Sequence, residues 1–127
     1  MGRKKTPHLT EGELRLMDVL WRKGACTVSA VVEAVEEDPA PAYSTVITTL
    51  RILENKGYVR HKKEGRAFLY EAVVTRAEAR RSAVGTLVRR FFEGSPELLM
   101  AHLFEGRKIS GKELERLRKM TAEEDRS

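Results

Sequence analysis

Apolar residues early in the chain repeat every three or four positions, which is the period of an amphipathic helix. In LTEGELRLMDVLWRKG the repeating positions are Leu14, Met17, Leu20 and Trp21. Thr10 and Glu13 have the spacing of a capping box, and Gly24 is a typical helix stop. We therefore expect a first helix over residues 11–23. A second apolar stripe in VSAVVEAVEED predicts another helix, which Thr27 caps and the prolines of DPAPA end.

The segment YSTVITTLRILENKG predicts a third helix with two opposite faces, over residues 44–56. At about 100° per residue, its apolar face carries Val46, Leu50 and Leu53. The opposite face is polar and carries Ser44, Thr48, Arg51 and Asn55. Gly57 ends the helix, so its outward surface presents small hydroxyls and one guanidinium.

Past this helix the pattern changes to strands and then returns to helices. YVRHKK, EGR and AFLYEAV predict a strand, a turn at Gly65 and a second strand, because aromatic and β-branched residues flank the glycine. Three further helices are predicted by their N-cap residues, Thr75, Ser95 and Ser110. The last residues, 123–127, are expected to fray.

Helix, short strand, helix, helix and hairpin is the element order of a winged helix-turn-helix. We therefore expect a mainly α fold with a small β-hairpin wing, followed by a C-terminal helical dimerisation region. The expected divisions are a flexible basic tail (1–8), the winged helix-turn-helix domain (9–74), the helical dimerisation region (75–122) and a frayed tail (123–127). In this fold the third helix lies in the major groove of DNA, and the hairpin tip touches the backbone or the minor groove.

Charge adds to this picture, because most of the basic excess lies in the third helix and the hairpin. The 127 residues carry a net charge of +5, and residues 51–66 contain six basic and two acidic side chains. Small hydroxyls can bond to phosphates or base edges, arginine can fork onto guanine, and lysine neutralises phosphate. The wing residues expected to give salt-sensitive affinity are His61, Lys62, Lys63 and Arg66. The plainer alternative is a solvated surface without a partner, which is the commoner fate of a charged hairpin.

The sequence contains no constellation typical of an enzyme or a metal site. A single cysteine, Cys26, excludes an intramolecular disulfide and indicates a small buried residue in a reducing compartment. His8, His61 and His102 are too dispersed to indicate a shared metal site. No Gly-rich phosphate loop or nucleophile motif is present, so we expect no cofactor and no catalysis. No apolar run approaches the roughly 20 residues that span a bilayer, and no secretory signal is visible, so we expect a cytoplasmic protein without membrane insertion.

Three motifs, YSTVITTL, LENKGYV and GRAFLY, resemble the penicillinase-repressor family of the BlaI/MecI/CopY type. The resemblance extends from Leu9 to about Lys119. It implies a winged-helix repressor that dimerises through its C-terminal helices and binds a dyad-symmetric operator. The residues of the third helix that would contact DNA are Tyr43, Ser44, Thr45, Thr48 and Arg51. The wing would contact DNA near Lys63 and Arg66.

Dimerisation also follows from the small size of the C-terminal region. Its short helices bury little apolar surface by themselves, and pairing two copies would cover their faces. Pairing would also hold two recognition helices about 34–36 Å apart, which an inverted-repeat site matches. The alternative is that these helices fold back on their own winged domain. The residues expected at the dimer interface are Val84, Leu87, Val88, Phe91, Leu98, Leu99, Leu103, Leu114 and Leu117.

The chain departs from the family pattern at the step that ends repression. In the best-known members, a membrane-bound β-lactam sensor leads to cleavage of the repressor at an Asn-Phe bond. The matching pair here is His102-Leu103, so cleavage at that bond is not implied, and a different signal or a different cut stays open. The cysteine-rich C-terminal motif of copper-responsive members is absent, which argues against copper sensing of that type.

Two functions from different classes are compatible with these patterns. The first is a homodimeric transcriptional repressor that binds operator DNA and is released by a sensor-linked signal or by proteolysis, with a membrane sensor protease acting indirectly. The second is a winged-helix module that binds an acidic protein through its basic surface, without sequence-specific DNA binding. Fold alone does not separate them, because one fold can host both purposes.

Overall fold

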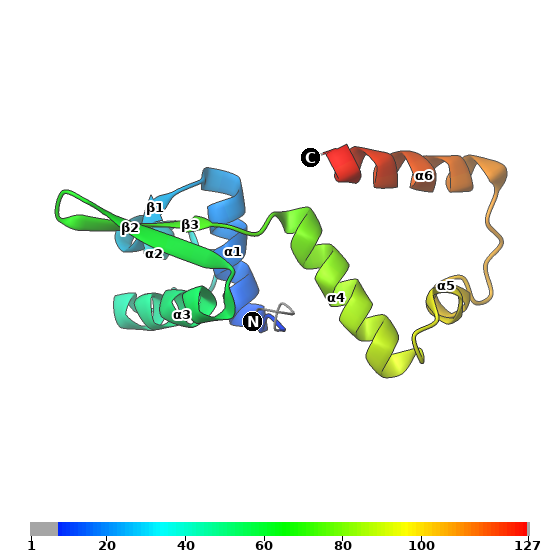
Figure 1. Cartoon of the computed structure of the whole chain (residues 1–127), viewed down its shortest axis with the longest axis horizontal. Helices are drawn as coiled ribbons and strands as arrows, with labels where there is room; N and C mark the ends of the chain where they lie inside the picture. The colour runs from blue at the N-terminus through cyan, green and yellow to red at the C-terminus, as the bar shows by residue number, and fades with distance from the viewer. Residues whose placement is uncertain (1–7, 127) are drawn as a thin grey trace. The chain divides into compact units, whose positions relative to one another are not determined.

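The computed structural model confirms the mainly helical fold with a hairpin wing (Figure 1). It describes residues 8–126, and their side chains up to residue 123. The elements are α1 (Glu11–Lys23), β1 (Cys26–Thr27), α2 (Val28–Ala34), α3 (Tyr43–Lys56), β2 (Val59–Glu64), β3 (Ala67–Ala72), α4 (Arg76–Phe91), α5 (Pro96–Leu103) and α6 (Gly111–Arg126). The chain divides into two units, the first ending at Arg76 and the second beginning at Ala77, so the division lies two residues beyond the expected one.

A three-stranded antiparallel sheet in the order β1-β3-β2 forms the wing and its base. β1 pairs with β3 through Cys26 and Tyr70, and the hairpin pairs Val59 with Ala72 at its base. Gly65 turns the chain between β2 and β3 at a φ of 62°, a left-handed conformation that favours glycine. The short β1 therefore ties the base of the wing to the start of α2.

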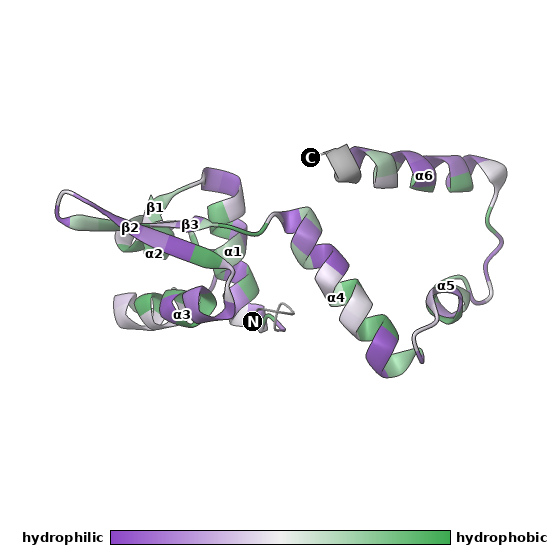
Figure 2. Cartoon of the chain, viewed as in Figure 1, coloured by the Kyte–Doolittle hydropathy of each residue, from purple (hydrophilic) through white to green (hydrophobic). Residues whose placement is uncertain are grey.

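Leucine and valine fill most of the core of the first unit. Its buried side chains are Leu16, Met17, Val19, Leu20, Cys26, Val28, Val31, Val35, Val46, Leu50, Leu53, Tyr58, Val59 and Tyr70. The apolar face predicted for the third helix is confirmed, because Val46, Leu50 and Leu53 are at most 1% exposed. Figure 2 shows polar and apolar residues alternating along α3, as a helix with one buried face requires.

α2 is shorter than the sequence predicts. The stripe VSAVVEAVEED indicated a helix up to DPAPA, but α2 ends at Ala34, and Val35 takes extended dihedrals of φ −70° and ψ 134°. A run of carboxylates at the C-terminus of a helix opposes the helix dipole. Glu36, Glu37 and Asp38 form such a run, so the helix stops before them, while Val35 stays buried in the core.

Both chain ends were expected to form tails, at residues 1–8 and 123–127. A frayed tail is expected over residues 123–127, and α6 continues to Arg126. Alanine, glutamate and arginine are good helix formers, and they extend the helix beyond its apolar repeat. The predicted flexible tail, residues 1–8, lies outside the described residues except for His8, and so does Ser127.

Trp21 and Arg76 link the segment after β3 to α1. The indole Nε1 of Trp21 donates to the Val74 carbonyl at 2.8 Å. The Arg76 guanidinium donates to Asp18 Oδ1 at 2.9 Å and lies 4.9 Å from the centre of the Trp21 ring. These contacts hold the chain against α1 up to the last residue of the first unit.

Glu13 joins α1 to α3. It forms the expected capping box with Thr10, in which each side chain accepts from the other residue's backbone N–H, at 2.9 and 3.1 Å. Its Oε1 also accepts from the Lys56 ammonium at 2.8 Å. Burial alone would raise the pKa of Glu13, but the bonds from Lys56 and from the Thr10 backbone lower it below its ordinary value. The carboxylate is therefore charged, although only 6% of the residue is exposed.

We expect Lys56→Met to lower the free energy of unfolding of the first unit by about 1–3 kcal/mol at neutral pH, because it leaves the buried Glu13 carboxylate without its cation. Because the folded pKa of Glu13 is lowered, its contribution is present above the unfolded pKa and is lost as pH falls through the folded value. The difference between the two proteins should thus shrink below about pH 4. Urea unfolding followed by the fluorescence of the single tryptophan, Trp21, measures it, with the exposed Lys63→Met as control.

Candidate nucleic-acid interface

The outward face of α3 carries hydroxyl groups that are available to a ligand. Ser44, Thr45 and Thr48 are exposed, and within the described part of the chain their hydroxyls form no hydrogen bond. Thr49 differs, because its hydroxyl donates to the Thr45 carbonyl at 2.8 Å. Asn55 is also exposed on this side of the helix. The polar face predicted from periodicity is therefore present, and most of its hydroxyls are unused.

The N-terminus of α3 has no side-chain cap. Ala42 precedes the helix, its methyl side chain cannot accept a hydrogen bond, and the first turn contains no acidic residue. The N–H groups of an uncapped first turn, together with the helix dipole, attract anions such as phosphate. Tyr43, the first residue of α3, is 54% exposed. Sequence reasoning missed this feature, although the alanine in PAYS is its signal, since caps are usually serine, threonine, aspartate or asparagine.

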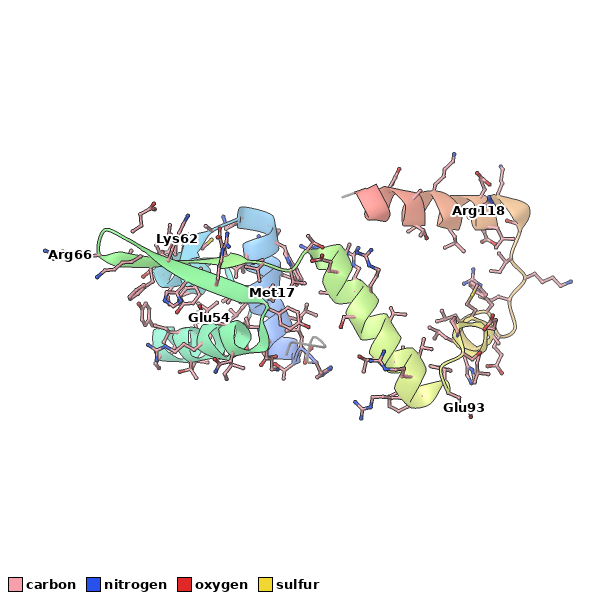
Figure 3. All side chains as sticks on the ribbon, viewed as in Figure 1. Met17, Glu54, Lys62, Arg66, Glu93 and Arg118 are labelled. Atoms are coloured by element: carbon pink, nitrogen blue, oxygen red, sulfur yellow. The ribbon has the colours of Figure 1, made fainter. Side chains whose placement is uncertain are left out.

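Strand register divides the basic residues of the wing between two faces. Residues paired across a hairpin point to the same side of the sheet. Lys63 therefore shares a face with the His61–Tyr70 pair, and Tyr70 is buried toward α3. Lys62 and its partner Leu69 lie on the opposite face, and Figure 3 shows Lys62 on the side of the hairpin away from α3.

The wing cations also differ in their partners. Arg66 is exposed at the tip of the hairpin (Figure 3). Arg60 donates from Nε to Glu71 Oε2 at 2.6 Å, and this hydrogen bond lowers the pKa of Glu71. In the described part of the chain, neither Lys62, Lys63 nor Arg66 forms such an ion pair. Their charges are free to attract a polyanion.

His61 links the wing to α3. Its Nδ1 lies 2.8 Å from Oε1 and 2.9 Å from Oε2 of Glu54. Its ring centre is 5.3 Å from the ring centres of both Phe68 and Tyr70. The sequence predicted His61 as a wing residue that gives salt-sensitive affinity, and in the structure its imidazole is paired with a carboxylate of α3.

Tyr70 brings Arg51 into the same cluster. Burial of the tyrosine, and then the negative charge of Glu54, raise the pKa of Tyr70 above its ordinary value. The Arg51 guanidinium opposes this rise, because its positive charge lies near the hydroxyl. Arg51 is therefore at the edge of the outward face of α3, where the helix meets the wing.

The second unit exposes a series of large apolar side chains. Most of the predicted interface residues are among them: Val84, Leu87, Phe91, Leu98, Leu103, Leu114 and Leu117. Leu99 is partly exposed, whereas Val88 is already buried within the single chain. Met100 and Met120, which sequence reasoning left out, are exposed as well. These helices leave much of their apolar surface uncovered in one copy of the chain.

The described residues hold neither a metal cluster nor a membrane span. Among the described side chains, no group of three or more His, Cys, Asp or Glu residues could hold a metal ion. Within residues 8–126, no helix combines the length and the apolar character needed to cross a membrane. Cys26 is buried as expected, and burial raises the pKa of its thiol against the opposing charge of Lys23.

A helical core that presents one polar helix, followed by a basic hairpin, defines the winged helix-turn-helix class of DNA-binding proteins. Within that class, the family model for the Penicillinase repressor matches residues 9–123. The chain therefore belongs to the penicillinase-repressor family, which consists of BlaI/MecI-type DNA-binding transcriptional repressors and not of enzymes.

Characterised members of the family are similar over most of the chain. The Penicillinase repressor of Bacillus licheniformis is 26% identical over 114 residues, which cover 90% of this chain and 89% of that protein. The Methicillin resistance regulatory protein MecI of Staphylococcus aureus is 22% identical over 114 residues, covering 90% and 93%. The solution structure of the DNA-binding domain of the repressor BlaI is 30% identical with a TM-score of 0.51, and the match covers 58% of this chain and 90% of that domain.

The Tyr70 cluster can be tested without DNA. We expect Arg51→Ala to raise the pKa of Tyr70 further, because the cation that opposes the rise is removed. Glu54→Ala should lower it, because a negative charge next to the hydroxyl is lost. NMR titration of ¹³C-labelled tyrosine rings measures both shifts. Arg60→Ala is the control, since this arginine lies on the other face of the hairpin, and a shift as large as that of Arg51→Ala would contradict the assignment.

Proposed function

We propose that this protein is a homodimeric transcriptional repressor that binds a dyad-symmetric operator. The observation that carries the proposal is the outward face of α3, where unused hydroxyls and Arg51 lie opposite a fully buried apolar face. Membership of a repressor family supports it. In this proposal α3 enters the major groove, and the wing lies against the phosphate backbone.

The residues of α3 would read the operator sequence while the wing anchors the DNA backbone. The proposed reading residues are Tyr43, Ser44, Thr45, Thr48 and Arg51, whose hydroxyls and guanidinium suit base edges and nearby phosphates. The proposed anchoring residues are Lys62, Lys63 and Arg66. Lys63 lies on the α3 side of the hairpin, so we expect it to contribute more to DNA affinity than Lys62.

The start of α3 supports the same orientation on DNA. Its uncapped N–H groups and the positive end of its dipole favour a phosphate at this end of the helix. Tyr43 is exposed beside this terminus, and its hydroxyl is a second donor for a phosphate oxygen. The helix would thus meet the backbone at its N-terminus and the bases along its outward face.

Dimerisation is proposed through the helices of the second unit. Their exposed leucines, together with Phe91 at 69% exposure, leave large apolar side chains in water, and clusters of such side chains are typical of protein–protein interfaces. A symmetric pair would cover these side chains and would present two copies of α3 to one face of the duplex.

Release from DNA is proposed to follow a sensor-linked signal or proteolysis, with a membrane sensor protease acting indirectly on a cytoplasmic repressor. The pair that matches the family's cleavage position, His102 and Leu103, lies at the end of α5. Leu103 is 61% exposed, so a protease could reach this end of the helix, although the Asn-Phe bond itself is absent.

The two proposed roles predict different effects on DNA binding. We expect Arg51→Ala to reduce discrimination between the operator and a scrambled duplex by about 1–3 kcal/mol, because a forked base contact is lost. Lys63→Ala should weaken binding to both duplexes alike and reduce the salt slope by about one unit. Fluorescence anisotropy over a range of salt, on the inverted repeat upstream of the protein's own gene, measures both quantities.

Two outcomes would count against this division of roles. Equal losses of discrimination from Arg51→Ala and Lys63→Ala would contradict it. Wild-type binding that ignores sequence at about 0.1 M salt would contradict specific repression and would favour a protein-binding module. Lys112→Ala, an exposed change on α6, is the matched control for the loss of one positive charge.

If the protein is a dimer, a charged substitution in the apolar surface of the second unit should lower its mass in solution. We expect Phe91→Glu to shift the protein from dimer to monomer at micromolar concentration, because a carboxylate cannot be buried there without a partner. Light scattering after size-exclusion chromatography measures the mass. Leu14→Glu, which alters an exposed leucine of α1, should leave the dimer intact, and a wild-type monomer would refute the proposal.

A further inference from the structure

Arg51 and Glu54 carry opposite charges three positions apart on α3. Side chains at this spacing are neighbours on a helix surface, where an arginine and a carboxylate attract each other. Among the described residues, however, no carboxylate oxygen lies within 4.0 Å of the Arg51 guanidinium. The sequence of α3 therefore favours an ion pair between Arg51 and Glu54, but the structure keeps these two side chains apart.

The wing accounts for this separation. Both carboxylate oxygens of Glu54 lie within 2.9 Å of His61 Nδ1. The imidazole is held in place by Phe68 and Tyr70, whose ring centres are each 5.3 Å away. Figure 3 shows Glu54 on α3, on the side of the helix that the hairpin covers. The Arg51 guanidinium lies instead near the Tyr70 hydroxyl, a neutral group that leaves most of the arginine N–H donors free.

We propose that His61 is a positioning residue for operator recognition. It pairs with the Glu54 carboxylate and so leaves Arg51 free to contact a base. The inference deepens the proposed function and rests on it, since it concerns which atoms of α3 can meet DNA. His61 acts through Glu54 and Arg51 and touches no base itself. The wing would thus have a second role in addition to anchoring the backbone.

The strength of the competing pair sets the size of the effect. An exposed arginine–carboxylate pair is weak, so an unoccupied Glu54 would reduce the availability of Arg51 by about two- to fivefold. Losing Arg51 altogether removes a forked base contact, which is worth roughly five- to hundredfold in discrimination. The effect of His61 should therefore be smaller than that of Arg51, and it should appear in sequence discrimination rather than in general affinity.

Three variants test the proposal on operator and scrambled duplexes: His61→Ala, Glu54→Ala and the double variant. We expect His61→Ala to reduce the ratio of the two affinities by about two- to fivefold. The double variant should restore the ratio, because no carboxylate is left to hold Arg51. Glu54→Ala alone should keep the ratio and strengthen binding to both duplexes, since one negative charge near the phosphates is gone.

If the His61–Glu54 contact only holds the wing against α3, we expect the opposite pattern. In that case Glu54→Ala would reduce the ratio as much as His61→Ala, the double variant would not recover, and the proposal would be overturned. Glu71→Ala is the matched control, because it breaks the Arg60–Glu71 pair on the other face of the hairpin. It should change both affinities alike and leave their ratio intact.

A measurement on the free protein separates this inference from the proposed function. The NMR signal of the Arg51 side-chain Nε–Hε group should shift in His61→Ala and return in the double variant. If it does not move, the inference is wrong, however the protein binds DNA. If it moves as expected while the wild type does not discriminate between duplexes, the proposed function fails and the pairing stands. His61→Leu replaces His61→Ala in all of these tests if Trp21 fluorescence shows that the alanine variant is unfolded, because leucine has no donor for the Glu54 carboxylate.

Discussion

The buried apolar face of α3 sets the arrangement of everything that could meet a ligand. Val46, Leu50 and Leu53 are at most 1% exposed, and exposing such side chains costs about 1.5–3 kcal/mol each. A rotation of α3 about its own axis would bring these side chains into water, so the helix is held in one orientation. Because helical residues have fixed angular positions, this orientation also determines where Ser44 and Thr48 point.

The wing depends on the same helix through its C-terminal end. Gly57 ends α3 in a left-handed conformation, with φ at 90°, and turns the chain toward β2. Lys56, just before it, is bonded to Glu13 of α1, which holds this end of α3 against the first helix. The register of β2 and β3 then brings His61 onto Glu54. Helix and wing therefore share a polar contact in addition to a common core.

Much of the fold could be predicted from the sequence, because helix phase, caps and turn glycines act over a few positions. The bounds of α1, the buried face of α3 and the cap at Thr10 all follow from such local signals. The end of α2 was missed, because an apolar stripe does not reveal the unfavourable acidic run that follows it. The pairing of Glu54 with His61 could not be predicted, since it depends on how the hairpin packs on α3. The burial of Val88 likewise depends on packing rather than on its place in a stripe.

We propose that the outward face of α3, continued by the wing, is the surface that meets DNA. The most direct measurement is an NMR titration of the ¹⁵N-labelled protein with a duplex that carries the inverted repeat upstream of its gene. We expect the amide signals of Ser44, Thr48 and Lys63 to change first and most, while those of the exposed Ser29 and Glu33 of α2 stay in place. Changes centred on α2, with α3 and the wing unaffected, would contradict it.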